Sequence, residues 1–579
     1  MRIQNSYVKR NIETIAFIML LFCTFMYNIS NIYGFTLYPD EFGYWSYAAK
    51  AAGYDWSQIL SMGSYYSYGY SLILFPVFIL CKSGITAYRA AVTINFILLA
   101  VTFFGLKYLA KKLFQDVKEK LLTFFVIIAV FYPPNLYYAK TTMVETLLVT
   151  MYAVICVLAY NYFEKSRWTA LLLLMLSLVY IHFAHMRTIA LMAAMVLTLL
   201  CKFIWQKKAA VQDVDAQKQK RKTIHYIMIV GIAVLLFAAG IALKQWVTAT
   251  MYAESQTLAH NDYAGQLSRI RYVFTLEGFK NLLISFLGKV LYLGLASFGT
   301  AIWGIWHALK KIKDKNIFWL FIFLSTLGAT MVNAVYTSIP GKRVDTLIYG
   351  RYHEYIIAIL MIAGLYEMWK SCRLIKGTIA LLIAELPMLL AVLCNVYVYK
   401  MDTIHMELVI GMSYFCDVEN FNPYHFLIIA YLFGVLLTLM AAFLISFMKR
   451  NKERQFLIIL IVGMELALSA RVTALSLNPT QLGIYRDTVI LDKINQLMED
   501  DRNVVYLDSG QPYISVMQFM DRDISIKVLE EYEDIEQYTE EEITDRSLVL
   551  IDYRDDFSEE LNKKYEHNLV SGHFALYYN

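Results

Sequence analysis

The sequence predicts an all-α polytopic membrane protein with about 13 transmembrane helices and a small C-terminal α/β extracytoplasmic domain. The first observation is composition: 58% of the residues are apolar, 17% are charged and the mean hydropathy is +0.48. The second is a repetition of apolar runs of about 17–25 residues, the length that crosses a bilayer as a helix. The third is a change near the C-terminus, where acidic residues outnumber basic ones by more than two to one.

The apolar runs give the predicted spans in chain order. The first follows a basic start, "MRIQNSYVKR", and has no small-residue cleavage site, so we interpret it as a retained span and not as a signal peptide. The predicted spans are 13–33, 88–106, 120–138, 143–163, 168–186, 188–205, 224–246, 281–308, 317–337, 353–370, 376–398, 424–448 and 455–471.

Lysine and arginine gather in alternate loops, which predicts the orientation. The basic segments include "KYLAKKLFQDVKEK", "KKAAVQDVDAQKQKRK" and "KSCRLIK", and we expect them in the cytoplasm together with the N-terminus. The opposite loops, including 34–67, 247–280 and 338–352, and the C-terminal domain are then extracytoplasmic. Residues 68–82 are apolar but short, with Gly69 and Pro76 inside. They are either a re-entrant helix, which this charge pattern favours, or a true span.

The C-terminal part reads as a separate unit. We place a transmembrane domain at 1–475 and an accessory domain at 476–579, where "NVVYLD", "ISIKV", "SLVLIDY" and "FALYYN" predict strands. The seven cysteines show no metal-binding or disulfide spacing. The net charge of +5 comes from cytoplasmic loops and is no argument for a nucleic-acid partner.

Asp40 and Glu41 follow directly on the first span, within "YPDEFGYW". In one interpretation, Asp40 caps an interfacial helix at about 41–52 and Glu41 favours its positive end. In the other, Asp40 is a general base toward an acceptor hydroxyl. The two are compatible, because a cap also fixes the carboxylate.

Other ionisable residues lie on the same predicted extracytoplasmic side of the membrane. Ionisable residues at the depth of the membrane are costly and are typical of functional sites. Glu145 is a helix cap, or else a second acid or metal ligand. His182 and His185 share a helical face but are weak evidence for a metal. Arg187 either snorkels to the interface or binds a lipid-linked phosphate, and Arg269 and Arg271 are weaker phosphate candidates.

The densest cluster is "YTSIPGKRVDTLIYGRYHEYI", residues 336–356. It contains more charges than a turn requires, and an anionic head group is the natural partner for its arginines. The candidate residues here are Lys342, Arg343, Tyr349, Arg351 and His353.

The "PDE" loop after the first span, then "YSYGYSLILFPVF" and the acid after "PPNLYYAK", resembles the GT-C superfamily of membrane glycosyltransferases. The resemblance is to the branch of protein O-mannosyltransferases and lipid A aminoarabinose transferases, and it covers mainly the N-terminal third.

This resemblance implies an inverting enzyme that moves a sugar from a polyprenyl-phosphate donor to a glycan, glycolipid or protein acceptor. The usage of Lys, Ile and Asn, with no predicted outer disulfides, indicates a bacterial plasma membrane, and so an enzyme of the cell envelope. Asp40 would be the base, Glu41 would assist, Glu145 would be a second acid, and Arg187, Arg343 and Arg351 would bind the departing phosphate. In the family, the segment after the first outer loop often carries a phosphate-binding lysine, whereas "YYSYGYS" offers only tyrosines and serines. A divalent metal cofactor stays open.

Two alternatives belong to other classes. A transporter or lipid flippase predicts acids and bases at span centres and internal repeats. We find no convincing repeat, and the polar groups cluster in the outer loops. A polysaccharide polymerase or ligase uses a diphosphate-linked donor and usually lacks the acid pair after the first span.

Overall fold

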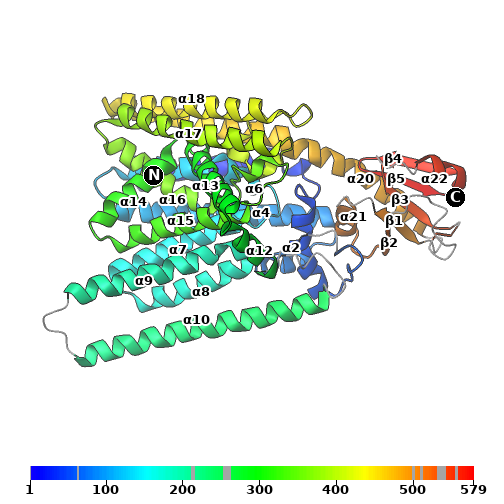
Figure 1. Ribbon diagram of the computed structural model, residues 1–579, viewed down its shortest axis with the longest axis horizontal. Coiled ribbons are helices and arrows are strands. Elements are labelled where there is room, and N and C mark those ends of the chain that lie inside the picture. Colours follow the sequence, from blue (N-terminus) through cyan, green and yellow to red (C-terminus); the bar gives the residue numbers. More distant parts are fainter. Residues whose placement is uncertain are drawn as a thin grey trace.

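The structure is a helical bundle with a small sheet domain at one end (Figure 1). This computed structural model describes residues 2–60, 64, 66–209, 216–251, 263–450, 452–498, 503–508, 513–530, 543–544, 546–553 and 558–579. The N-terminus lies at the far end of the bundle from the sheet domain, and α2 lies at the near end. The helices of the bundle are α1 (Arg2–Met26), α2 (Tyr38–Ala51), α3 (Ser71–Leu80), α4 (Gly84–Leu113), α5 (Glu119–Val130), α6 (Pro133–Tyr138), α7 (Glu145–Lys165), α8 (Trp168–Ala184), α9 (Ile189–Ala209), α10 (Ala216–Met251), α12 (Tyr263–Val273), α13 (Leu276–Ala296), α14 (Thr300–Lys313), α15 (Ile317–Tyr336), α16 (Ile357–Lys370), α17 (Leu374–Tyr399), α18 (Pro423–Arg450) and α19 (Ile458–Val472).

Within the described residues, ten helices are long and apolar enough to cross a membrane. The sequence predicted thirteen spans. The difference falls on 120–138, 168–186 and 353–370, which correspond to the shorter helices α5, α8 and α16. A chain of this kind is a multi-pass membrane protein.

Two predicted spans are interrupted for identifiable reasons. The run 120–138 ends as α5 and restarts as α6, because consecutive prolines open α6. The run 281–308 is divided into α13 and α14 by a turn in which Phe298 and Gly299 have φ values of 53° and 75°. α3 has ten residues, about 15 Å of helix, and is too short to cross a bilayer.

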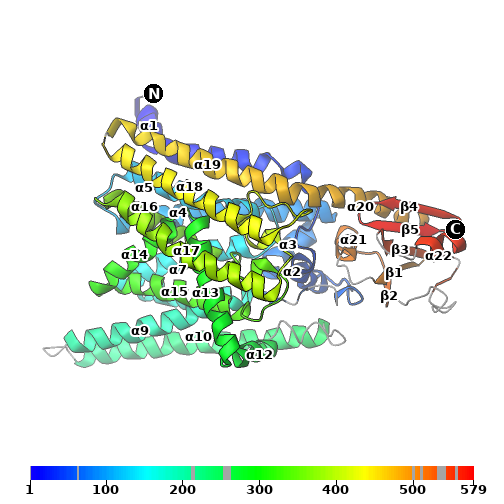
Figure 2. The same ribbon diagram turned by 45° about the horizontal axis from the view of Figure 1, so that its top comes forward.

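A single long helical stretch joins the bundle to the sheet domain. α19 continues through a π-helical turn (Thr473–Leu477) into α20 (Asn478–Leu497), and together they reach from the bundle to the sheet (Figure 2). The domain boundary predicted at residue 475/476 therefore falls inside a continuous helical segment.

The C-terminal domain has a five-stranded mixed sheet in the order β2-β1-β3-β5-β4. β1 pairs in parallel with β2 and β3, whereas β5 pairs antiparallel with β3 and β4. The four predicted strands are confirmed, and β4 was missed because its side chains are mostly exposed. The elements are β1 (Val504–Asp508), α21 (Ile514–Met520), β2 (Ile526–Glu530), β3 (Leu548–Asp552), α22 (Ser558–Lys564), β4 (His567–Ser571) and β5 (Phe574–Tyr578).

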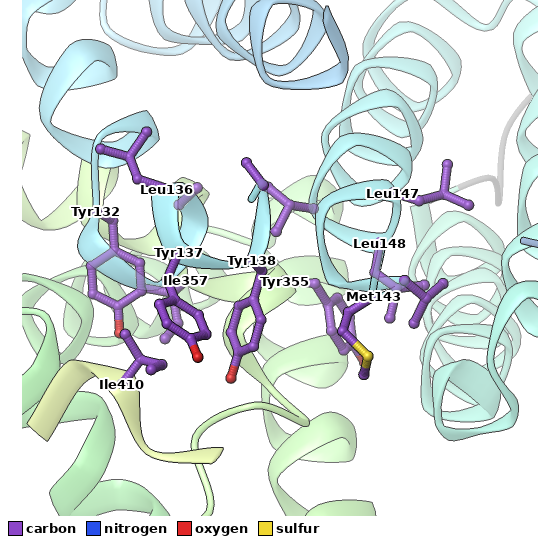
Figure 3. Packing of buried hydrophobic residues seen from close by; sticks show 14 of the residues in the cluster. Tyr132, Leu136, Tyr137, Tyr138, Met143, Leu147, Leu148, Tyr355, Ile357 and Ile410 are labelled. Atoms are coloured by element: carbon purple, nitrogen blue, oxygen red, sulfur yellow. The ribbon is translucent and has the colours of Figure 1, made fainter. Parts of the chain in front are cut away.

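The core around α6 is rich in tyrosine. Figure 3 shows Tyr137 and Tyr138 of α6 in one buried cluster with Tyr355, which precedes α16. The Tyr137 hydroxyl contacts Ser476 Oγ at 2.7 Å, and Tyr138 donates to the Glu407 carbonyl at 2.7 Å. These buried hydroxyls tie α6 to the π-helical turn and to the loop before α18.

Replacing Gly364 with alanine is expected to lower the melting temperature clearly. A Cβ on Gly364 in α16 would lie 1.8 Å from the Thr300 carbonyl oxygen, and one on the facing Gly304 would lie 2.1 Å from the Leu360 oxygen. Such overpacking costs about 1–3 kcal/mol or more. The matched control is Gly463→Ala, where the added Cβ meets nothing within 4 Å. Equal melting curves for the two variants would contradict this packing.

Candidate active site

α2 places the first two predicted residues in different surroundings. The helix begins at Tyr38, so Asp40 is inside its first turn, and the predicted role of Asp40 as N-cap of a helix at 41–52 is wrong. The N-cap position is Leu37, and Glu41 Oε1 accepts the backbone N–H groups of Thr36 (2.7 Å) and Leu37 (2.9 Å), which come just before the helix. Glu41 thereby fixes the chain where it enters α2, and the helix dipole favours its negative charge there.

Glu41 is fully buried and lines neither of the cavities described below. Its Oε2 accepts from the Tyr88 hydroxyl at 2.7 Å, and from the backbone N–H and the hydroxyl of Thr142 at 2.7 and 2.5 Å. Burial raises the pKa of Glu41 more than these hydrogen bonds lower it. Glu41 thus joins α2 to α4 and to the loop before α7.

Asp40 belongs to a buried network of two carboxylates and two guanidinium groups. Arg351 donates from Nη1 to Asp40 Oδ2 at 2.5 Å and from Nε to Glu145 Oε1 at 2.6 Å. Arg187 Nη2 donates to the same Glu145 oxygen at 2.9 Å. The side chains of Glu145, Arg187 and Arg351 are at most 4% exposed, and that of Asp40 is 15% exposed. The structure thus brings together four residues that lie far apart in the sequence.

The donors of this network are only partly used. Arg187 Nε and Nη1 and Arg351 Nη2 are buried without a hydrogen-bond partner among the described residues. The Arg187 guanidinium lies over the Tyr352 ring at 4.6 Å. Buried donors without partners are costly, and an anion with several oxygens would satisfy them.

Two cavities meet beside this network. A polar cavity of about 780 Å³ is lined by Asp40 and Arg351 among others, and an apolar cavity of about 370 Å³ is lined by His185 and Arg187. They share the side chains of Tyr66, Tyr336 and Tyr352. The rest of the apolar wall comes from Ser67, Met186, Ile189, Lys244, Ile270, Met331, Val332 and Val335.

The residues of the predicted cluster at 336–356 lie in three places: the polar cavity, the buried core and the exposed surface. Arg343 and Tyr349 line the polar cavity together with Arg351, and Arg343 Nη2 pairs with Asp345 at 2.5 Å. Lys342 is exposed and lines neither cavity. His353 is buried, with Nδ1 2.7 Å from the Asn333 amide nitrogen, and it also lines neither cavity.

The remaining predicted residues are also separated by the fold. Arg269 lines the polar cavity, donates to the Tyr336 carbonyl at 2.6 Å and lies 4.1 Å from the Tyr336 ring centroid. Arg271 is exposed and lines neither cavity. His185 Nδ1 accepts the Arg187 N–H at 3.3 Å, so His185 fixes the backbone that carries Arg187.

Several lining residues were not predicted. Tyr66 stacks on Tyr44 of α2 at 4.4 Å and, like Ser64, hydrogen-bonds to Asp40. Lys244 reaches the apolar cavity from α10, where it is the one charged residue between 228 and 251. A lysine inside an apolar run is the sequence signal that identifies such a position.

A metal was left open by the sequence. In the part of the chain that the structure describes, no group of three or more His, Cys, Asp or Glu side chains converges. Asp40 Oδ2 and Glu145 Oε1 accept from guanidinium groups, and these positive charges would repel a cation placed beside them. These residues do not fit a metal centre, and we derive no step through one.

The pKa of Asp40 is lowered in the folded chain. Burial raises it, but the Arg351 guanidinium and hydrogen bonds from Ser64 and Tyr66 outweigh that effect. A lowered carboxyl pKa stabilises the fold above the unfolded value of about 3.9 and ceases to do so as the pH falls through the lower folded value. We therefore expect the difference in melting temperature between the wild type and Asp40→Asn to be constant from pH 8 to 5 and to shrink below about pH 4. A difference that grows on acidification would contradict this assignment.

No protein-family model matches the chain, and no curated protein matches its sequence significantly. Solved structures match its fold, two of them over 97% of this chain and 97% of the other, at 12% identity. These two are ArnT from Cupriavidus metallidurans in the apo state, with a TM-score of 0.56, and the same protein bound to undecaprenyl phosphate, with a TM-score of 0.57. At this identity the likeness concerns the fold, and it confirms the resemblance predicted from the loop after the first span. The chain is a multi-pass membrane protein with the fold seen in ArnT.

Proposed function

We propose that the protein is an inverting glycosyltransferase that moves a hexosyl or pentosyl group from a polyprenyl-phosphate donor to an acceptor hydroxyl. The observation that carries this proposal is the meeting of the two cavities at the Asp40–Arg351–Glu145–Arg187 network. An apolar cavity suits a prenyl chain, unpaired guanidinium donors suit a phosphate, and a polar cavity suits a sugar. The ArnT structure with undecaprenyl phosphate supports the same donor class.

In the proposed reaction, the acceptor oxygen attacks the anomeric carbon as the bond from that carbon to the phosphate oxygen breaks. The acceptor proton passes to an Asp40 oxygen, and the lipid phosphate leaves with the bonding electrons. Arg187 and Arg351 stabilise the phosphate with donors already in place. A phosphate bound to Arg351 also weakens its hold on Asp40, which makes Asp40 a stronger base when the donor is present.

We further propose that the site faces the outside of a bacterial plasma membrane, with the N-terminus in the cytoplasm. The positions of the basic helix ends support this orientation, because the basic C-terminal ends of α16 and α18 lie next to each other and next to the loop after α4. Lys370 pairs with Asp116 at 2.7 Å, and Lys449 donates to the Ser371 carbonyl at 2.6 Å. Such basic ends are typical of the cytoplasmic side.

The transporter alternative predicted acids at span centres, and the structure does contain two. Glu385 in α17 and Glu465 in α19 are buried, and their carboxyl oxygens have no partner among the described residues. Neither lines the polar or the apolar cavity. They are therefore not part of the site on which the proposal rests, and glycosyl transfer is the function that the geometry supports best.

Filling the apolar cavity tests the donor. Val335→Trp is expected to lower kcat/KM for a labelled undecaprenyl-phosphate sugar roughly tenfold or more, because the prenyl chain loses apolar contact worth a few kcal/mol. A donor with a short, soluble prenyl chain should lose less. The matched control is Val398→Trp, since Val398 is 57% exposed on α17 and lines neither cavity. Equal activity of both variants with the long-chain donor would contradict the assignment of this cavity.

A further inference from the structure

The polar cavity extends beyond the Asp40–Arg351 pair to a wall built from distant parts of the chain. Tyr38 comes from α2, Glu407 from the loop before α18, Thr480 from α20 and Tyr513 from the sheet domain. This wall, Tyr38, Glu407, Thr480 and Tyr513, is called the distal wall below. None of its members belongs to the charged network.

We propose that the distal wall is the acceptor subsite and that it takes an uncharged carbohydrate. The sugar ring packs against Tyr38 and Tyr513, and its hydroxyls donate to the Glu407 carboxylate. This inference rests on the proposed function and names the acceptor class that the proposed function leaves open.

The two tyrosines are held rigidly. Their rings meet edge to face at 5.0 Å, and Tyr513 is stacked on His573 at 4.2 Å with an interplanar angle of 15°. His573 is fixed in turn by Asp487 of α20, through its N–H at 2.7 Å and its Nδ1 at 2.8 Å. Rigid aromatic faces bind apolar faces of a ligand with little loss of entropy.

A glycine next to His573 allows the close approach of Asp487. Gly572 has φ 62°, and a Cβ there would lie 1.9 Å from Asp487 Oδ1. The loop before α2 is attached to the same helix, since Gln481 Oε1 accepts the Tyr33 N–H at 2.6 Å. α20 therefore positions Tyr513 and the start of α2 together, and the sheet domain is part of the cavity and not a detached accessory.

Glu407 is positioned as a hydrogen-bond acceptor for a ligand. Tyr138 donates to its backbone carbonyl at 2.7 Å, and the Ser476 hydroxyl donates to its Oε1 at 3.2 Å. Among the described residues, no Lys, Arg or His side chain forms an ion pair with it. A carboxylate that lines a cavity and keeps free lone pairs accepts from sugar hydroxyls.

The charges of the cavity argue against an anionic acceptor at this wall. Arg343 is paired with Asp345, and Arg351 is shared by Asp40 and Glu145. Arg269 lies over Tyr336, which belongs to the wall shared with the apolar cavity, so its charge is on the donor side. An acceptor phosphate at the distal wall would meet the Glu407 carboxylate and be repelled by it.

The test uses the purified full-length protein with a panel of labelled undecaprenyl-phosphate sugars. Four acceptors are compared: water, measured as donor hydrolysis, neutral octyl hexosides, a phosphorylated hexoside and a Ser/Thr peptide. The variants are Glu407→Gln and Tyr513→Ala. Their matched controls are Glu419→Gln and Tyr553→Ala, which are exposed positions outside both cavities. Tyr513→Phe keeps the ring.

We expect transfer to octyl hexosides, with KM for the hexoside raised roughly tenfold in Glu407→Gln and Tyr513→Ala, from loss of a charged hydrogen bond or an aromatic face. Donor hydrolysis should stay within about twofold of wild type. Tyr513→Phe, which keeps the aromatic face, should raise KM less than Tyr513→Ala, and the controls should behave as wild type. A preference for the peptide or the phosphorylated hexoside, no transfer to any hexoside, or equal losses of hydrolysis and transfer would overturn the inference. If the wild type transfers sugar from no donor to any of the four acceptors, water included, the proposed function itself fails, which is a different result.

Discussion

Asp40→Asn is expected to reduce sugar transfer by about 10²–10⁴-fold, the usual contribution of a positioned general base. Asparagine keeps the size of the side chain, and its amide oxygen still accepts from Arg351, but it takes no proton from the acceptor. Asp40 also contacts Ser64 and Tyr66 at the wall of the polar cavity, and asparagine can keep these contacts. Because the substitution removes only the proton acceptor, the loss should appear in kcat more than in KM for the donor. Transfer is measured with a labelled polyprenyl-phosphate hexose and a crude envelope extract as the source of acceptors.

The adjacent residue Glu41 provides the comparison for Asp40→Asn. Glu41→Gln removes an anion that accepts from Thr36, Leu37, Tyr88 and Thr142 and lines neither cavity. We expect it to lower the melting temperature while the surviving folded protein keeps its transfer rate. Asp55→Asn, an exposed position, is the neutral control. Equal transfer by Asp40→Asn and wild type would remove Asp40 from the chemistry and direct attention to Glu145.

Arg351→Gln is expected to destabilise the protein by about 3–5 kcal/mol and to abolish transfer. Arg351 is the one cation that contacts both Asp40 and Glu145 among the described residues, and its side chain is 2% exposed. Its removal leaves two buried carboxylates with only Arg187 beside them, and breaking a buried ion pair from one side has a cost of this size. Melting temperature in detergent and transfer rate are the measurements.

A double-mutant cycle distinguishes the loss of the Glu145–Arg351 ion pair from a general loss of stability. Glu145→Gln combined with Arg351→Gln removes one anion together with the cation, so it should be more stable than the sum of the single effects implies. Arg271→Gln, at an exposed arginine outside both cavities, should leave stability and transfer unchanged. Additive losses in the cycle would contradict the direct contact between Arg351 and Glu145.

The separation of the candidate residues shows how sequence position and spatial position differ. Asp40 and Glu41 are adjacent in the chain, yet one lines the cavity and the other is enclosed by five hydrogen-bond donors. A helix turns by about 100° per residue, so neighbours face different directions, and only packing determines which direction is the cavity. In the turn before α16, Arg351 reaches Glu145, whereas His353, two residues later, faces Asn333 in the core.

The sequence by itself determined the class of the protein, most of its spans, four of the five strands of its C-terminal domain and the region that carries Asp40. These follow from local chemistry: apolar length, period-two alternation and charges placed next to apolar runs. The tertiary structure decided that four charged residues from four separate segments form one network, that α5, α8 and α16 are shorter than the predicted spans, and that α20 brings Tyr513 to the cavity. Such contacts depend on how helices pack across hundreds of residues, and no local pattern in the sequence encodes that packing.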